Sequence, residues 1–209
     1  MATNTKINYI LAHGAGAPSN SEWMETLTKT IKSKSKNQIE VHRFNFNYME
    51  RRLKENKKYP PDRMPKLLQK WQEVINHHTG KKNLFIGGKS MGGRSATLLD
   101  FESFKEIKGI VNFGFPFHAP GKPPGGRVNH LKNLSVPCLI NQGERDPMGN
   151  TEEINSYKLP SNIKLNYLID GNHDLKPRVK SGKTLETNIN EAVDEMISFM
   201  MKVINKQNS

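Results

Sequence analysis

Cysteine is almost absent from this sequence, since Cys138 is the only one among 209 residues. A single cysteine excludes any intrachain disulfide, so a hydrophobic core has to stabilise the fold. Cys138 itself stands in the apolar segment 136–140, where we expect a small buried core residue rather than a nucleophile. Long apolar runs are absent as well, and no stretch approaches the ~20 residues of a membrane-spanning helix. We therefore expect no membrane partner.

The sequence also lacks the marks of targeting and of cofactor binding. No basic segment followed by a long apolar core opens the chain, so we predict no signal peptide and a cytoplasmic protein. There is no phosphate-binding loop, and no set of His, Cys, Asp and Glu residues has the spacing of a metal site. The sequence therefore predicts neither a cofactor nor a metal.

Acidic residues are few: 20 stand against 32 basic residues, which gives a formal net charge of +12. Such an excess can indicate a nucleic-acid partner. The lysines, however, are scattered or lie in surface-like segments such as 32–36 and 54–58, with no zinc-finger spacing and no aromatic RNA-binding strand beside them. A solvated basic face is the favoured interpretation, so no specific nucleic acid is expected, and binding to DNA or RNA is a weaker alternative.

What the sequence does contain is a regular alternation of short apolar runs and helical patterns. The six apolar runs that predict strands are residues 7–12, 39–46, 83–87, 107–113, 136–141 and 163–169. Helical patterns cover residues 22–32, 65–78, 91–101, 151–157 and 185–203. Residues 47–61 read as an exposed connection with room for a short helical turn, and 114–130 as a loop. Nearly continuous apolar strands that alternate with helices indicate α/β architecture. We predict a mainly parallel, doubly wound sheet of about six strands in a three-layer α/β/α sandwich, formed by one domain over residues 1–209.

The third apolar run leads into Gly88-Lys89-Ser90-Met91-Gly92, which fits the G-x-S-x-G pattern of a nucleophile elbow. In such an elbow the serine sits on a strained turn between strand and helix, too tight for side chains at the flanking positions. The pattern alone is weak, because short glycine and serine combinations occur by chance. A strand before it and a helix after it make Ser90 a candidate nucleophile.

Two further reactive side chains follow later strands. Asp146 comes after the fifth predicted strand and His173 after the sixth. Because the carboxyl ends of parallel strands share one edge of a sheet, we expect both to meet Ser90 there. His173 would take the serine proton and Asp146 would orient the imidazole. Asp170 and Asp174 are alternatives for the orienting acid, although their closeness to His173 favours a role in shaping its loop.

Backbone N–H groups are the candidates for stabilising an oxyanion. Met91 would supply one at the helix start, and the loop His13-Gly14-Ala15-Gly16 would supply another from Ala15 or Gly14. His13 could be catalytic, but a role in shaping this turn is favoured.

The loop after the fourth predicted strand carries candidate substrate-binding residues. Phe115, Phe117 and His118 either line a pocket or pack their loop onto the core, and the sequence favours neither alternative. Lys89 could touch an anionic substrate, or it could be a tolerated residue within the elbow.

Taken together, these motifs resemble the α/β-hydrolase superfamily, and most of all its small, nearly lidless branch of dienelactone hydrolase-like and testis-expressed-protein-like hydrolases. The order Ser, Asp, His along the chain is the order of that superfamily. The pieces that carry the resemblance are residues 11–16, 88–94, 115–123, 142–147 and 171–176. The resemblance implies Ser90, Asp146 and His173 as nucleophile, acid and base, and no cap domain.

The expected function is that of a serine hydrolase acting on a small carboxylic ester or related acyl compound, a carboxylesterase-like enzyme with no cofactor. We expect it to be a monomer or a small homo-oligomer. The alternative is a hydrolase-fold interaction or scaffold protein without turnover, since fold does not fix function.

Overall fold

The computed structural model describes residues 6–123 and 127–208. Its centre is a six-stranded sheet in which every neighbouring pair of strands is parallel. The strands are β1 (Ile7–Ala12), β2 (Ile39–Phe44), β3 (Leu84–Lys89), β4 (Ile107–Phe113), β5 (Cys138–Gly143) and β6 (Ile163–Leu168), in the order β2-β1-β3-β4-β5-β6. The predicted α/β sandwich with a parallel doubly wound sheet is confirmed.

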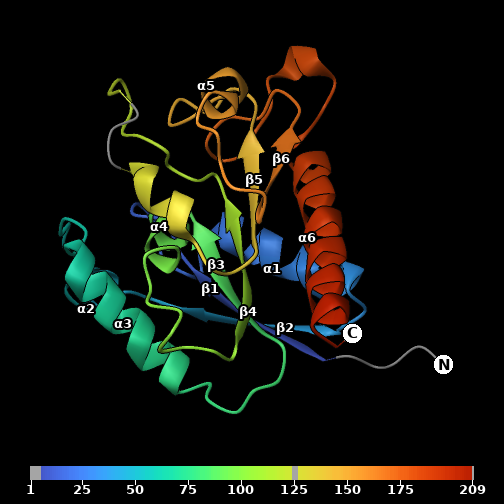
Figure 1. Ribbon diagram of the computed structural model, residues 1–209. Coiled ribbons are helices and arrows are strands. Elements are labelled where there is room, and N and C mark those ends of the chain that lie inside the picture. Colours follow the sequence, from blue (N-terminus) through green and yellow to red (C-terminus); the bar gives the residue numbers. More distant parts are fainter. Residues whose placement is uncertain (1–5, 124–126, 209) are drawn as a thin grey trace.

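Helices connect the strands and cover both faces of the sheet (Figure 1). They are α1 (Glu22–Lys34), α2 (Asn47–Glu55), α3 (Met64–Asn76), α4 (Met91–Ala96), α5 (Thr151–Asn155) and α6 (Leu185–Asn208), with short 3-10 segments η2 (Asn129–Asn133) and η3 (Val179–Ser181). Within the described residues, no helix is long and apolar enough to cross a membrane.

The core has two halves, one on each face of the sheet. Along β1 the side chains alternate: Ile10 and Ala12 pack with α3 and α4, whereas Tyr9 and Leu11 pack with α1 and α6. This alternation follows from the period of two residues in a strand. Because both faces are covered, most residues of the inner strands are apolar, which explains the apolar runs of the sequence.

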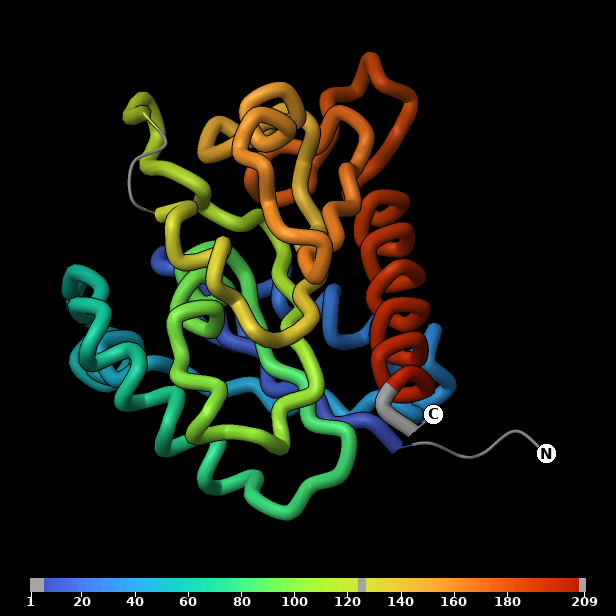
Figure 2. Tube along the Cα trace, viewed as in Figure 1, coloured from blue at the N-terminus to red at the C-terminus, as the bar shows by residue number. Residues whose placement is uncertain are grey.

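Strand order reverses between β1 and β3, and this reversal positions the candidate site. The chain runs from β1 out to β2 and then returns to place β3 on the other side of β1. In such sheets a crevice opens beyond the carboxyl ends of the strands at the reversal. The segments that follow β5 and β6 lie side by side at the same end of the molecule (Figure 2), and Gly143 packs directly on Gly171.

One connection differs from the prediction. Residues 47–61 contain a nine-residue helix, α2, where the sequence predicts an exposed connection with at most a short helical turn. The helix is mostly charged and buries only Tyr48 and Met49, so its apolar stripe is too short to stand out as a pattern. The helix after Ser90 is also shorter than predicted, since α4 ends at Ala96. No cap domain is present among residues 6–123 and 127–208.

Candidate active site

Ser90 stands on a strained turn between β3 and α4. Its backbone has φ 51° and ψ −119°, a combination that costs a non-glycine residue on the order of 1–3 kcal/mol. A Cβ added at Gly88 would lie 2.5 Å from the carbonyl oxygen of Ala12, and one at Gly92 would lie 2.5 Å from that of His13. Glycine is therefore required on both sides of the serine, as the elbow pattern predicted.

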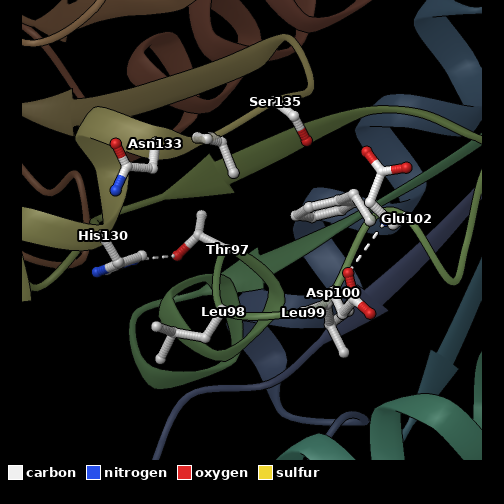
Figure 3. A pocket seen from close by; sticks show the side chains of 10 residues that line it. Thr97, Leu98, Leu99, Asp100, Glu102, His130, Asn133 and Ser135 are labelled. Atoms are coloured by element: carbon white, nitrogen blue, oxygen red, sulfur yellow. Dashed lines mark hydrogen bonds between the residues drawn. The ribbon is translucent and has the colours of Figure 1, made fainter.

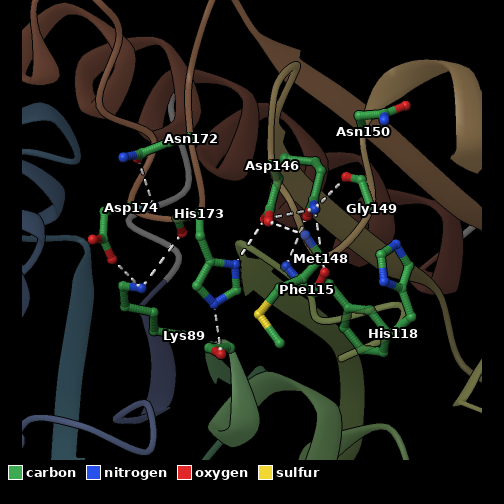
Figure 4. A network of polar contacts seen from close by, with 12 residues as sticks. Lys89, Phe115, His118, Asp146, Met148, Gly149, Asn150, Asn172, His173 and Asp174 are labelled. Atoms are coloured by element: carbon green, nitrogen blue, oxygen red, sulfur yellow. Dashed lines mark hydrogen bonds and ion pairs between the residues drawn. The ribbon is translucent and has the colours of Figure 1, made fainter. Parts of the chain in front are cut away.

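The structure brings Ser90, His173 and Asp146 together. His173 Nε2 lies 2.8 Å from Ser90 Oγ, and His173 Nδ1 lies 2.8 Å from Asp146 Oδ2 (Figure 4). Asp146 is completely buried. An ionised carboxylate can only accept hydrogen bonds, so Nδ1 carries the proton and Nε2 presents its lone pair to the serine hydroxyl. This arrangement can remove a proton from Ser90.

A buried amide holds the Asp146 carboxylate in place. Gln142 Nε2 donates to Asp146 Oδ2 at 2.8 Å and to the carbonyl oxygen of Gly149 at 2.9 Å. The other carboxylate oxygen, Oδ1, accepts from the N–H of Met148 at 2.8 Å. Gln142 in turn accepts from the N–H of Phe115 at 2.7 Å. The carboxylate thus accepts three hydrogen bonds, shared between its two oxygens, and is fixed from several directions.

The two alternative acids have other partners. Asp170 Oδ1 lies 2.8 Å from Nε of Arg145 and also binds the Arg178 guanidinium. Hydrogen bonds from Arg178 hold the pKa of Asp170 well below its usual range. Asp174 pairs with Lys89 at 2.6 Å. Both carboxylates therefore shape the loop that carries His173, the role that the sequence analysis favoured for them.

A cleft of 650 Å³ opens over the serine. Ser90 and His173 form its floor, and Trp23 and Met148 belong to its apolar walls. Lys89 lines it too, but its ammonium group is engaged: it pairs with Asp174, lies 3.4 Å from the carbonyl oxygen of His173 and sits 5.2 Å from the centre of the Trp23 ring.

The loop after β1 lies against the nucleophile. A Cβ added at Gly14 would be 3.6 Å from the Ser90 Cβ, and Gly14 and Ala15 both line the cleft. Met91 begins α4 directly after Ser90, so its N–H belongs to the first turn, where helix N–H groups have no partner within the helix. Gly14 and Met91 therefore lie next to the serine, and Ala15 lines the same cleft.

His13 shapes this loop from below. Its ring is completely buried, Nε2 accepts from the N–H of Phe46 at 3.1 Å, and Nδ1 lies 2.6 Å from the carbonyl oxygen of Gly14. Accepting at Nε2 places the proton on Nδ1, which donates to Gly14. Burial lowers the pKa of His13 and so favours this neutral form. The position agrees with the structural role that the sequence analysis favoured.

Phe115, Phe117 and His118 do not line the cleft, which corrects their selection as substrate-binding residues. Both phenylalanines are completely buried, with ring centres 4.9 Å apart, and belong to the core beneath the loop. The His118 ring bonds the carbonyl oxygen of Ala119 and lies 3.3 Å from Glu153 at the start of α5. Of the two alternatives, packing onto the core is the one that fits. Gln142 bonds both the N–H and the carbonyl oxygen of Phe115, which holds this part of the loop against the core.

A second hollow lies beside α4 and η2, away from the serine (Figure 3). Its lining includes Thr97, Asp100, Glu102 and His130. His130 Nε2 lies 2.9 Å from the Thr97 hydroxyl, and burial lowers the pKa of His130 to about 4. A neutral histidine held by a threonine is a structural feature, and the hollow contains none of the predicted site residues.

Sequence reasoning missed several side chains that support the site. Gln142 could have been noticed as a polar residue at the end of an apolar strand, just before the turn that carries Asp146. Trp23, whose Nε1 donates to the carbonyl oxygen of Asp174 at 3.0 Å, lies within the helical pattern of residues 22–32, and such a pattern does not mark a site. Tyr48 and Arg52 lie on α2, a longer helix than the short turn that the sequence allows there, and no local signal links them to the loop after β1.

A parallel doubly wound sheet with a strained serine between β3 and α4, and with an imidazole and a carboxylate at the same edge, defines the α/β-hydrolase fold. A family model described as alpha/beta hydrolase domain matches residues 5–201, and the chain belongs to this family. No curated protein matches the chain.

Solved structures show the same fold at low sequence identity. Est1E from Butyrivibrio proteoclasticus is 14% identical with a TM-score of 0.67, and the match covers 96% of this chain and 90% of that one. Est1E with ferulic acid bound matches with a TM-score of 0.69 at 14% identity, over 96% and 92% of the two chains. Dienelactone hydrolase from Anabaena variabilis is 15% identical with a TM-score of 0.64, over 92% of this chain and 86% of that one. Family and fold together support a hydrolase.

Proposed function

We propose that the protein is a serine hydrolase that cleaves small carboxylic esters through an acyl-Ser90 intermediate. The observation that carries the proposal is the chain of two 2.8 Å contacts from Ser90 Oγ through His173 to the buried Asp146. A serine hydroxyl needs a base to act as a nucleophile at neutral pH, and this chain supplies one already oriented.

The reaction then proceeds in two halves. Ser90 Oγ attacks the ester carbonyl carbon while its proton passes to His173 Nε2, and N–H groups of Met91 and of the loop after β1 stabilise the negative charge on the carbonyl oxygen. The imidazolium, held by Asp146, returns the proton to the leaving alcohol, which leaves an acyl group on Ser90. A water molecule, deprotonated by His173, attacks this acyl group in the same way and releases the carboxylic acid.

The cleft favours an uncharged substrate. Its apolar lining comes from the walls around Trp23, Met24, Met148 and Leu185. Lys89, which lines the cleft together with Lys176 and precedes Ser90 in the chain, pairs with Asp174 at 2.6 Å. A substrate carboxylate would have to displace that ion pair, so esters with neutral acyl groups should react faster than esters of dicarboxylic acids.

A panel of esters tests the proposal. We expect hydrolysis of p-nitrophenyl acetate and butyrate and slower hydrolysis of the p-nitrophenyl monoester of succinic acid. Methyl ferulate belongs in the panel, because Est1E binds ferulic acid and Trp23 offers an aromatic wall. Ser90→Ala should lower kcat on the order of a million-fold if the three residues act as a unit. Hydrolysis that survives Ser90→Ala, with the variant folded, would contradict the proposal.

A further inference from the structure

The carbonyl oxygens of the loop after β1 are bound from behind by α2. The Tyr48 hydroxyl lies 3.0 Å from the carbonyl oxygen of Ala15 and 3.4 Å from that of Gly14. Arg52 Nη1 donates to the Ala15 carbonyl oxygen at 3.2 Å. His13 Nδ1 adds a contact of 2.6 Å to Gly14. Two successive carbonyl groups of this loop therefore face the side chains of α2 and His13.

The direction of these carbonyl groups also fixes the direction of the N–H groups that follow them in the loop. In a planar trans peptide the carbonyl of one residue and the N–H of the next point in opposite directions. The carbonyls of Gly14 and Ala15 point towards α2, so the N–H groups of Ala15 and Gly16 point away from it. All three residues line the cleft that contains Ser90. These two N–H groups are therefore directed towards the cleft.

We propose that Tyr48 and Arg52 are positioning residues for the oxyanion site, and that this loop supplies its donors from Ala15 and Gly16. The inference rests on the proposed esterase function. The N–H of Gly14, which the sequence also suggested as a donor, belongs to the preceding peptide, so the contacts with α2 do not orient it. A donor that is fixed before the reaction needs no reorganisation when charge develops on the carbonyl oxygen, and that is how such sites accelerate acyl transfer.

Both side chains of α2 are themselves fixed. Arg52 Nε donates to the carbonyl oxygen of Tyr59 at 2.6 Å, and the guanidinium carbon lies 4.9 Å from the centre of the Tyr48 ring. Tyr48 is 1% exposed, and burial raises its pKa to about 12, so it remains a hydroxyl donor at neutral pH. The contact between α2 and the loop is consequently rigid and insensitive to pH around neutrality.

The chain offers a matched control in Arg51. It neighbours Arg52 on the same helix, is exposed, and places its guanidinium 3.8 Å from the centre of the Tyr59 ring instead of on the loop after β1. Arg51→Met and Arg52→Met remove the same charge from the same helix. Any difference between them reports on the contact with Ala15.

The experiment compares Arg52→Met, Tyr48→Phe and Arg51→Met with the wild type. The readouts are kcat and KM for p-nitrophenyl butyrate and the inhibition constant of an aryl boronic acid, whose tetrahedral serine adduct places an oxygen in the oxyanion site. Removing a donor outright costs about 100-fold to 1,000-fold in kcat, so a lost positioning contact should cost about 10-fold. We expect that loss in kcat and in boronate affinity for Arg52→Met and Tyr48→Phe, with KM unchanged. Arg52→Lys should restore part of both, and Arg51→Met should behave as wild type.

Three outcomes would overturn the inference. One is unchanged kcat and boronate affinity in folded Tyr48→Phe and Arg52→Met. Another is a rise in KM alone, and the third is an equal loss in Arg51→Met. Tyr48→Phe removes a single oxygen, so it decides the matter if Arg52→Met fails to fold. If the wild type hydrolyses no ester, the proposed function fails and this inference fails with it; if the wild type is active and the variants match it, only this inference fails.

Discussion

The two loops that face each other across the cleft are held by different chemistry. The loop after β1 is held through its backbone carbonyl oxygens, which accept from Tyr48, Arg52 and His13. The loop that carries His173 is held through side-chain carboxylates, because Asp170 binds two arginines and Asp174 binds Lys89. Carbonyl oxygens do not titrate, whereas carboxylates do, and exposed ion pairs are screened by salt. Salt and acid should therefore loosen the side that carries the base before the side that carries the oxyanion donors.

The exposure of the ion pairs reinforces this difference. The Asp174 side chain is 59% exposed although its partner Lys89 is only 13% exposed, and half of the Arg178 side chain is in contact with solvent. Burial alone would raise the pKa of Asp174, but the hydrogen bond and the charge of Lys89 bring it below the usual value. The stabilisation from this pair is present at neutral pH and is lost as the pH falls through the lowered pKa.

After loss of the nucleophile itself, the largest expected effect comes from Asp146, the carboxylate that binds both His173 and the turn after β5. Asp146→Asn should lower kcat about 10,000-fold, because an amide can donate to His173 Nδ1 and would favour the tautomer that cannot accept the serine proton. Asp170→Asn is the matched control. It removes a carboxylate from the loop that carries His173 and should cost far less activity. Steady-state kinetics of both variants with p-nitrophenyl butyrate provide the measurement. An equal or larger loss in Asp170→Asn would mean that the orienting acid is wrongly assigned.

A smaller effect is expected from the ion pair between Lys89, in the elbow, and Asp174, in the loop that carries His173. Asp174→Asn and Lys89→Met should each lower kcat/KM by about 5-fold at most, since a partly exposed ion pair contributes about 1 kcal/mol or less. Raising the salt concentration should reduce wild-type activity by a similar factor and leave these variants unaffected. Activity titrated against sodium chloride tests this. Equal salt dependence in the wild type and in Asp174→Asn would remove the proposed difference between the two loops.

Part of the site could be predicted from the sequence because its signals are local. The elbow glycines, the strand ends and the chain order of Ser90, Asp146 and His173 are all visible in short segments. The contacts behind the loop after β1 are not, since Tyr48 and Arg52 act on backbone atoms more than 30 residues away. Such contacts leave no periodicity, and neither residue type marks a site.

The aromatic loop after β4 is a case in which the residues are conspicuous in the sequence but their role is not. Phe115 and Phe117 lie in a segment rich in glycine and proline, where aromatic side chains are as compatible with a pocket wall as with a core. Which alternative holds depends on where the loop returns, and that is set by contacts such as those of Phe115 with Gln142. These contacts join segments that are distant in the sequence, so whether the aromatic residues line a pocket or pack in the core is fixed only when the sheet is assembled.

The last prediction concerns the stability of the whole fold in acid, as distinct from the stability of the loop that carries His173. Burial lowers the pKa of His42 and of His130 to about 4, against a usual value near 6.5. Between these values the unfolded chain binds more protons, so the free energy of unfolding should fall as the pH drops from 7 to 5. His42→Gln should reduce that fall by on the order of 1 kcal/mol. Urea unfolding at pH 7 and pH 5 measures it, and an unchanged pH dependence in the variant would contradict the assignment.

The most direct test of the central claim, that Ser90 is an activated nucleophile, is labelling with a fluorophosphonate probe followed by intact-protein mass spectrometry and peptide mapping. We predict one probe per chain on Ser90, no labelling of Ser90→Ala, and markedly slower labelling of Asp146→Asn. A folded wild-type protein that stays unlabelled, or that carries the probe on another residue, would contradict the claim.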